Sequence, residues 1–193
     1  MIKILVLIDS ATEFSRRFLS GLVRYAHENG PWIFYRLPLY YKMLYGEEGV
    51  LEQIKEWGID AVIVQWEYRE IKFLKKLDIP VFLQNYEDNA DWFSKISGDY
   101  MEVGAIAANF FAQKRFKNFA FYGNKNFLWS KGRAEGYRIE VEKLGGNYYY
   151  FESEYLTNSQ WSRSHIKLNK WLSSLPKPVA VFACDDYFAL QVA

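Results

Sequence analysis

The sequence predicts an α/β fold with parallel sheets, because short apolar runs with strand character alternate with amphipathic helical runs along the chain. Half of the 193 residues are apolar and 19% are aromatic, which is enough to fill a sizeable core and argues against disorder. The alternation restarts after a polar, basic joint at residues 113–117. We therefore expect two doubly wound subdomains, residues 1–116 and residues 117–193.

The first half of the chain carries four predicted strands and the helices between them. The strands are expected at residues 2–8, 32–35, 61–65 and 81–84. The first helix is marked by apolar residues at helical spacing and ends near Asn29 and Gly30; its expected buried face is Phe14, Phe18, Leu22 and Tyr25. Two shorter helices are expected at residues 51–55 and 71–75, the first of them closing at Gly58.

The first subdomain is expected to end with a helix for which Asp99 is the N-cap, and its expected packed face is Val103, Ile106, Ala107, Phe110 and Phe111. Strands follow at residues 118–122, 148–151 and 179–183. Between the first two lies a helix with Ser130 as its expected N-cap, whose packed face is expected to be Ala134, Tyr137, Val141 and Leu144. Another helix carries Ile166, Leu168 and Trp171.

The last predicted helix opens at Asp185 and Asp186 and reaches Ala193 without a glycine or proline to end it. A strand and helix unit that stops in this way is typical of a divided domain. We therefore expect the second subdomain to be incomplete and the chain to be the front portion of a longer protein.

Charge and composition narrow the function classes. The 24 basic and 23 acidic side chains are well mixed and give a formal net charge of +1, so no basic face for nucleic acid is indicated. The single cysteine, Cys184, rules out an internal disulfide framework. His27 and His165 are isolated from each other and from Cys184 in the sequence, so no metal site is predicted. The N-terminal apolar run has no signal-peptide pattern and is too short to cross a bilayer. A cytoplasmic protein without metal, cofactor or membrane partner is expected.

Arg133 stands out because local physics disfavours a cation at its position. It lies four residues before Tyr137, so the two share the packed side of the predicted helix. It also lies in the first turn, where the helix macrodipole disfavours positive charge. A cation there, beside Trp129 and above the end of a strand, indicates that Arg133 binds a ligand or pairs with a carboxylate.

Polar and aromatic residues follow most of the predicted strands, at the sheet edge where ligands bind in parallel α/β folds. These groups are Asp9 and Ser10; Gln65, Trp66 and Glu67; Gln84, Asn85 and Tyr86; Asn124 with Trp129; and Asp185 and Asp186. Neutral and acidic hydrogen-bonding groups beside indole rings suit a sugar, whose hydroxyls need polar partners and whose C–H faces pack on aromatic rings. A single one of them can equally be a helix cap, and of Asp185 and Asp186 we expect one to bind and the other to cap.

Several other chemistries lack the residues that they need. The first strand is followed by Asp-Ser-Ala-Thr-Glu and not by the glycines of a phosphate cradle. Gln65 occupies the third strand end, where a receiver domain would carry its phosphoacceptor aspartate. No glycine-flanked serine elbow exists, and Cys184 has no histidine near it in sequence, so no catalytic residue is predicted. Trp161 has two open interpretations: it staples its helix to the core, or it forms a stacking wall for a ligand.

Motifs spread over nearly the whole chain resemble sugar-sensing regulators built on the periplasmic-binding-protein type I fold, the lactose-repressor type. Within that group they are most similar to the effector domain of AraC-type xylose-operon regulators. The matching pieces are Phe14-Ser-Arg-Arg with Gly21 and Tyr25; Asp99 with Gly104; Arg115-Phe-Lys-Asn-Phe-Ala-Phe-Tyr-Gly123; Trp129 with Arg133; Gln160-Trp161; and Asp186-Tyr-Phe-Ala189. The Phe-Ala-Phe-Tyr-Gly run followed by Trp-x-x-x-Arg is the most specific of them.

The resemblance implies roles for individual residues. Asp99 and Arg133 would bond sugar hydroxyls, Trp161 would pack on the sugar, and Asp185 would stand where the family has asparagine. Asp9, Gln65 and Trp66 fall at pocket-lining loops. Arg133 would belong to the second subdomain and would face Asp9 and Asp99 from the first.

The expected function is therefore a sugar-sensing effector domain that binds a monosaccharide, D-xylose first, between its subdomains and does not catalyse a reaction. The expected ligand residues are Asp9, Gln65, Trp66, Asp99, Trp129, Arg133, Trp161 and Asp185. The resemblance also implies a homodimer that reaches DNA through a domain not in this chain. Two alternatives stay open: a transport-type sugar receptor of the same fold, and a sugar-processing α/β enzyme with Asp9 or Glu67 as base.

Overall fold

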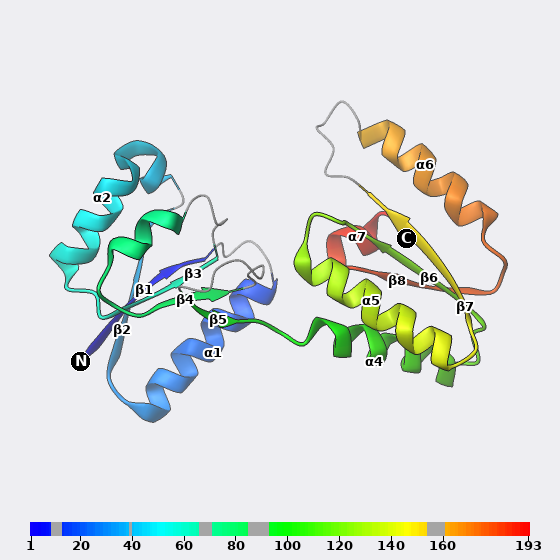
Figure 1. Ribbon diagram of the computed structural model, residues 1–193, viewed down its shortest axis with the longest axis horizontal. Coiled ribbons are helices and arrows are strands. Elements are labelled where there is room, and N and C mark those ends of the chain that lie inside the picture. Colours follow the sequence, from blue (N-terminus) through cyan, green and yellow to red (C-terminus); the bar gives the residue numbers. More distant parts are fainter. Residues whose placement is uncertain (9–12, 39, 66–70, 85–92, 154–160) are drawn as a thin grey trace. The chain divides into compact units, whose positions relative to one another are not determined.

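The chain folds into two compact units, Met1–Ser97 and Gly98–Ala193 (Figure 1). The computed structural model describes residues 1–8, 13–38, 40–65, 71–84, 93–153 and 161–193, and of residues 161–164 the backbone alone. Each unit is built on its own parallel sheet, as the alternating pattern predicts.

The first unit is a five-stranded parallel sheet in the order β2-β1-β3-β4-β5. Its strands are β1 (Ile2–Leu7), β2 (Trp32–Arg36), β3 (Ala61–Val64), β4 (Val81–Gln84) and β5 (Ser94–Ile96). Its helices are α1 (Glu13–Asn29), α2 (Tyr41–Trp57) and the 3₁₀ helix η1 (Lys72–Lys76). β5 was not predicted, because its three residues are all exposed and carry no apolar run.

Helices cover both faces of this sheet because successive strand residues point to opposite sides. Leu5 and Leu7 pack with Val50 and Ile54 of α2. Ile4 and Val6 form a separate cluster on the other side; the apolar residues of α1 packed against it are Phe18, Leu19 and Leu22. The sheet of the first unit is therefore doubly wound, as expected.

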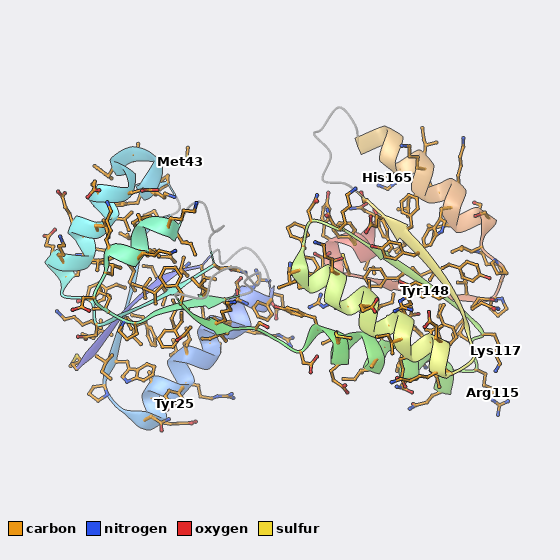
Figure 2. All side chains as sticks on the ribbon, viewed as in Figure 1. Tyr25, Met43, Arg115, Lys117, Tyr148 and His165 are labelled. Atoms are coloured by element: carbon orange, nitrogen blue, oxygen red, sulfur yellow. The ribbon has the colours of Figure 1, made fainter. Side chains whose placement is uncertain are left out.

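Two helices of the first unit differ from the prediction. Phe18 and Leu22 pack on the sheet, but Phe14 and Tyr25 are about half exposed; Figure 2 labels Tyr25 on α1. α2 starts at Tyr41, ahead of the expected residue 51, and Gly46 at φ 68° joins two helical pieces. The first piece points apolar side chains outward, among them Met43 (Figure 2), so it lacked the amphipathic pattern that the prediction relied on.

The second unit is a three-stranded parallel sheet in the order β7-β6-β8. Its strands are β6 (Asn118–Gly123), β7 (Asn147–Glu152) and β8 (Val179–Ala183), and its helices are α4 (Tyr100–Gln113), α5 (Leu128–Lys143), α6 (Trp161–Ser174) and α7 (Asp186–Leu190). On one side of β6, Phe119 and Phe121 contact Tyr137 of α5. On the other side, Tyr122 contacts Phe188 of α7 at 5.1 Å between ring centres.

The boundary between the units lies between Ser97 and Gly98, ahead of the seam expected at residues 113–117. The reason is the packing of α4 on α5. A Cβ atom added to Gly104 would lie 2.3 Å from the carbonyl oxygen of Arg133, and one added to Gly136 would lie 1.9 Å from the carbonyl oxygen of Met101. The two helices therefore touch backbone to backbone, and α4 belongs to the second unit.

The same contact explains why the expected face of α4 is largely wrong. Val103, Ile106 and Phe110 are exposed, whereas the fully buried residues of the helix are Gly104 and Ala108. Close backbone approach needs the smallest residues at the interface, so the larger apolar side chains point away. Of the expected face, Ala107 and Phe111 do pack against the core, so apolar periodicity predicted the buried side only in part.

Replacing Gly136 by alanine tests this backbone contact. The added methyl group has no room against the Met101 carbonyl, so we expect Gly136→Ala to lower the free energy of unfolding by about 3 kcal/mol or more. Gly21 of α1 is the control, since a Cβ there meets nothing within 4 Å. Gly21→Ala should raise the stability by up to about 1 kcal/mol. Chemical denaturation followed by circular dichroism measures both, and equal effects would refute the contact.

The Tyr137 hydroxyl gives a second test of the core. Tyr137 is fully buried among aromatic rings, burial raises the pKa of its phenol, and the hydroxyl has no hydrogen-bond partner. Because an unpaired buried hydroxyl is costly, Tyr137→Phe should raise the free energy of unfolding by about 1 kcal/mol. A loss of stability in the same denaturation experiment would show that the hydroxyl has a partner in solution.

Candidate functional site

In the second unit, Arg133 and the ends of β6 and β8 meet at one edge of the sheet. The Arg133 side chain leaves the second turn of α5, because the helix begins at Leu128, ahead of the start expected from Ser130. Its NH1 atom donates a hydrogen bond to the carbonyl oxygen of Cys184, directly after β8. The carbon at the centre of the guanidinium lies 5.2 Å from the ring centre of Trp129 and 5.7 Å from that of Tyr100. Arg133 therefore has an aromatic ring from each of α4 and α5 beside it.

These contacts answer why a cation tolerates this position. Partial burial disfavours the cation, whereas the macrodipole acts mainly on the first turn of α5, which ends ahead of Arg133. Two aromatic faces offset part of that penalty, each by about 0.5–1 kcal/mol or more when partly desolvated. The Cys184 carbonyl adds a charge-assisted hydrogen bond. The Nε atom is buried and still has no hydrogen-bond partner, so the guanidinium keeps one inward donor unused.

A hydrogen-bonded network lies next to Arg133 and fixes the loop after β6. Ser130, expected as the N-cap of α5, is instead a buried residue inside the helix, which begins at Leu128 after an uncapped Phe127. Its Oγ accepts from the backbone N–H of Asn124 at 3.0 Å and also bonds the thiol of Cys184. Burial raises the pKa of that thiol to about 12, so Cys184 stays protonated and unreactive, in line with the structural role expected for it.

Unpaired buried polar atoms concentrate at the carboxyl ends of the strands. Among the described residues, four buried side-chain polar atoms lack a hydrogen-bond partner: Gln84 Oε1, Asn124 Nδ2, Arg133 Nε and Tyr137 Oη. Gln84 ends β4 and Asn124 directly follows β6, while Arg133 of α5 bonds the carbonyl that follows β8, so three of the four lie at or beside strand ends. Buried polar groups are normally satisfied, and a ligand is one partner that these could take. The sequence pattern marked both strand ends, but we did not select these two residues as ligands.

In the first unit, Gln65 is the expected site residue that the structure describes. It follows β3, its backbone N–H donates to Leu7, and its side-chain Oε1 accepts from the hydroxyl of buried Ser15 at 3.3 Å. This contact joins the ends of β1 and β3 to α1. Asp9 and Trp66 lie outside the described residues.

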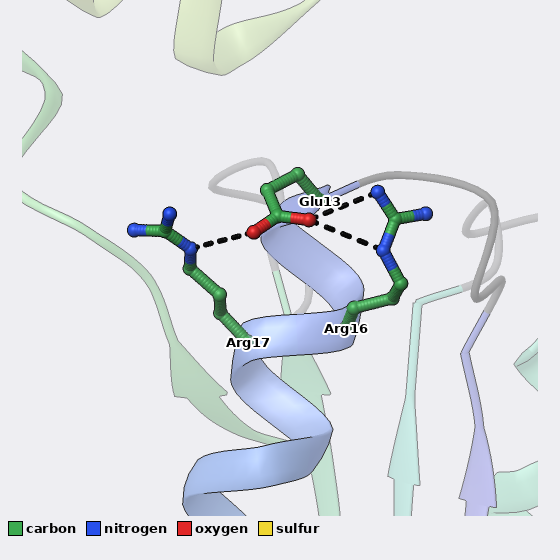
Figure 3. A network of polar contacts seen from close by, with 3 residues as sticks. All are labelled: Glu13, Arg16 and Arg17. Carbon is green, nitrogen blue, oxygen red and sulfur yellow. Dashed lines mark hydrogen bonds and ion pairs between the residues drawn. The ribbon is translucent and has the colours of Figure 1, made fainter.

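The start of α1 carries the arginines of the Phe14-Ser-Arg-Arg motif. Figure 3 shows Arg16 and Arg17 bonded to Glu13, at 2.9 Å and 2.8 Å. The hydrogen bonds from Arg17 and then Arg16 lower the pKa of the Glu13 carboxyl. Both guanidinium groups therefore form ion pairs with Glu13 of the same helix.

Two of the expected carboxylate ligands are helix caps. Asp99 accepts a hydrogen bond from the backbone N–H of Glu102 at 2.9 Å and caps α4, as predicted. It lies in the second unit with Arg133, so its assignment to the first subdomain is corrected. Asp185 accepts from Phe188 at 2.9 Å and caps α7, while Asp186 is an exposed residue of the first turn. Each cap uses one carboxylate oxygen, which leaves the other oxygen for a further partner.

The two expected indole rings differ in what can be said of them. Trp129 is half-buried, stacks on Phe127 with ring centres 5.0 Å apart, and lies beside Arg133. Trp161 is the first residue of α6, and its side chain lies outside the described part of the chain. Tyr100 was not predicted as a site residue, although its place directly after the Asp99 cap put an aromatic ring at the start of α4.

Metal-binding and membrane-spanning features are absent from the described residues. No group of three or more His, Cys, Asp or Glu side chains in those ranges could hold a metal ion. No helix in the described part of the chain is long and apolar enough to cross a bilayer.

Comparison with known proteins agrees with this fold. Residues 108–193 match the family model of the periplasmic binding protein-like domain. A PurR family transcriptional regulator from Vibrio parahaemolyticus superimposes with a TM-score of 0.68 at 17% identity, over 100% of this chain and 73% of that one. No curated protein sequence matches the chain.

Two further solved structures carry a bound sugar. A periplasmic binding protein/LacI transcriptional regulator from Alkaliphilus metalliredigens, complexed with D-xylulofuranose, gives a TM-score of 0.63 at 16% identity, over 99% of this chain and 70% of that one. A LacI family transcriptional regulator from Enterococcus faecium with bound ribose gives 0.67 at 14% identity, over 98% and 69%. At these identities the likeness establishes the fold: parallel α/β units of the kind found in LacI and PurR regulators.

Ser130→Ala tests the network beside Arg133. Removing the hydroxyl takes away the acceptor of the buried Asn124 N–H, so we expect the free energy of unfolding to fall by about 1–2 kcal/mol. Ser174→Ala is a matched control, because that hydroxyl is exposed and bonds only the local Trp171 carbonyl; it should change stability by less than about 0.5 kcal/mol. Urea titrations of both variants make the comparison, and equal losses would contradict the network.

Proposed function

We propose that this chain is the effector-binding module of a transcription regulator and that its effector is a monosaccharide. The observation that carries the proposal is Arg133, whose buried Nε has no partner although the guanidinium is fixed by the Cys184 carbonyl and two aromatic rings. Such a donor is prepared for an acceptor that the described residues do not supply. It lies at the sheet edge where parallel α/β folds bind ligands.

The chemistry around Arg133 favours a neutral polyhydroxylated ligand. Trp129 offers an aromatic face for C–H groups, and Asn124 offers an unused amide donor. Asp185 directly follows Cys184 and brings a carboxylate, so the site contains both charges and does not select a strongly charged ligand. In this proposal Arg133 and Asn124 donate to sugar hydroxyls, and Asp185 accepts from them.

Residues of the first unit complete the proposed site. Gln65 and Gln84 stand at its strand ends, and Asp9 and Trp66 belong to the same edge by sequence. Asp99 and Trp161 keep the roles that the family resemblance implies, a hydroxyl ligand and a stacking ring. In this proposal, binding draws the two units together around the sugar. Such a closure would change the conformation of the rest of the regulator.

The finer assignments come from sequence motifs and from the ligands of structural relatives. The AraC-type xylose-operon resemblance makes D-xylose the first candidate, and the solved structures with D-xylulofuranose and ribose support a pentose-sized ligand. A homodimer in the cytoplasm that reaches DNA through a domain outside this sequence is part of the same proposal. The relatives named above are regulators and a binding protein-like regulator, which favours a binding role over catalysis.

Calorimetry on the full-length protein tests the proposal. We expect heat of binding with one pentose from a panel of D-xylose, D-ribose, L-arabinose and D-glucose. An analogue lacking one hydroxyl should bind about 100-fold more weakly, because the polar groups of the site would be left unpaired. No heat from any sugar would refute the sugar-binding role.

Arg133→Ala locates the site. It should weaken binding by at least about 100-fold, since it removes a charged donor, while the far-UV circular dichroism stays native. Lys131→Ala, an exposed change two residues earlier on α5, is the control and should bind like wild type. If Arg133→Ala unfolds the protein while the remaining folded fraction binds normally, Arg133 is structural only.

A further inference from the structure

Tyr100 contacts both Arg133 and the residues where the chain passes from the first unit to the second. These residues, Ser97 and Gly98, are called the crossing segment below. It is the first residue of α4, two positions after Gly98, with which the second unit begins. Its half-buried ring lies 5.7 Å from the centre of the Arg133 guanidinium. Its hydroxyl oxygen accepts a hydrogen bond from the backbone N–H of Gly98. One side chain therefore contacts both the proposed ligand donor and the crossing segment.

The ring has little freedom to move between these two contacts. A Cβ atom added to Gly132 of α5 would lie 2.7 Å from the Cβ of Tyr100, so α5 packs directly against the base of this side chain. A Cβ added to Gly98 would lie 3.4 Å from the Tyr100 ring, at van der Waals distance. A change in the position of the ring therefore shifts either the crossing segment or α5 at Gly132.

The helix start adds a second fixed point. Asp99 caps α4 through the Glu102 N–H, and the Val103 N–H bonds the Asp99 carbonyl at 3.1 Å. These two bonds fix the chain at Asp99 to the first turn of α4. The hydroxyl of Tyr100 extends that hold by one residue, to Gly98, with which the second unit begins.

We infer that Tyr100 is a positioning residue that couples the state of the Arg133 guanidinium to the order of the crossing segment at Gly98. When a ligand acceptor bonds the unpaired Nε, the guanidinium and the ring beside it are held more firmly, and the Gly98 amide becomes better protected. Coupling of this kind is reciprocal, so a more ordered segment also favours the Arg133 position that binds. Binding of the sugar at Arg133 would then change the order of the residues with which the second unit begins.

Hydrogen exchange in the full-length protein without ligand tests the coupling independently of the proposed function. Mass spectrometry would follow peptides that contain Gly98 in Tyr100→Phe, Arg133→Met and the double variant. Each single change should speed exchange by about threefold, the size expected from losing one cation–π contact or one hydrogen bond. The double variant should be no faster than Tyr100→Phe, because both changes break the same chain of contacts.

Controls separate coupling from general loosening. Arg133→Lys keeps a cation near the ring and should restore most of the protection. Tyr187→Phe alters a half-exposed tyrosine elsewhere in the second unit and should leave exchange at Gly98 unchanged. Additive effects in the double variant, or an Arg133→Met protein with wild-type exchange at Gly98, would overturn the inference.

A second hydrogen-exchange experiment adds the sugar. It rests on the proposed function, so its result is interpreted separately from the variant comparison. The pentose that gives heat in calorimetry should slow exchange at Gly98 in the wild-type protein. In Tyr100→Phe it should bind within about threefold of the wild-type affinity and leave Gly98 unprotected. Equal slowing in both proteins would overturn the coupling, whereas the absence of any sugar binding would overturn the proposed function and leave the variant comparison to decide the coupling.

Discussion

The backbone contact between α4 and α5 is the constraint on which the second unit depends. Gly104 and Gly136 let the helices approach so closely that a single methyl group on either side has no room. Asn109 of α4 also donates to Glu140 of α5 at 3.0 Å, which fixes their register. Because the helices are held at this distance, the first turn of α4 lies beside the second turn of α5. Arg133 and Tyr100 meet for this reason.

Arg133 shows how a fold can hold a charge that its surroundings disfavour. Partial desolvation opposes the guanidinium, while two aromatic faces and the Cys184 carbonyl offset that cost. The Cys184 carbonyl is itself placed by β8, which pairs with β6 in register. The sheet and both helices thus converge on one side chain, and the unpaired Nε is the donor that this arrangement leaves over.

Most of the fold could be predicted from sequence because the strands are short apolar runs with clear ends. β6 and β8 lie within one residue of their expected ranges. The unit boundary and the buried face of α4 could not, since a glycine contact leaves no apolar pattern to read. Of the proposed site, Arg133, Asp99 and Asp185 are residues whose positions the sequence pattern marks, and their ligand roles stay predictions. Tyr100 was missed because its role depends on which helix packs against which, and strand-end reasoning contains no such information.

Asp185 shows why a capping role and a ligand role need not compete. Its Oδ1 accepts the Phe188 N–H, so the side chain has already lost rotamer freedom in the folded protein. A ligand that bonds the remaining oxygen does not have to order the side chain again, and binding loses less entropy than it would with a mobile carboxylate. The same holds for Arg133, which is fixed before any ligand arrives. Strand-end residues that serve the fold are for this reason well suited to recognition, and their structural bonds are part of what makes a rigid polar site.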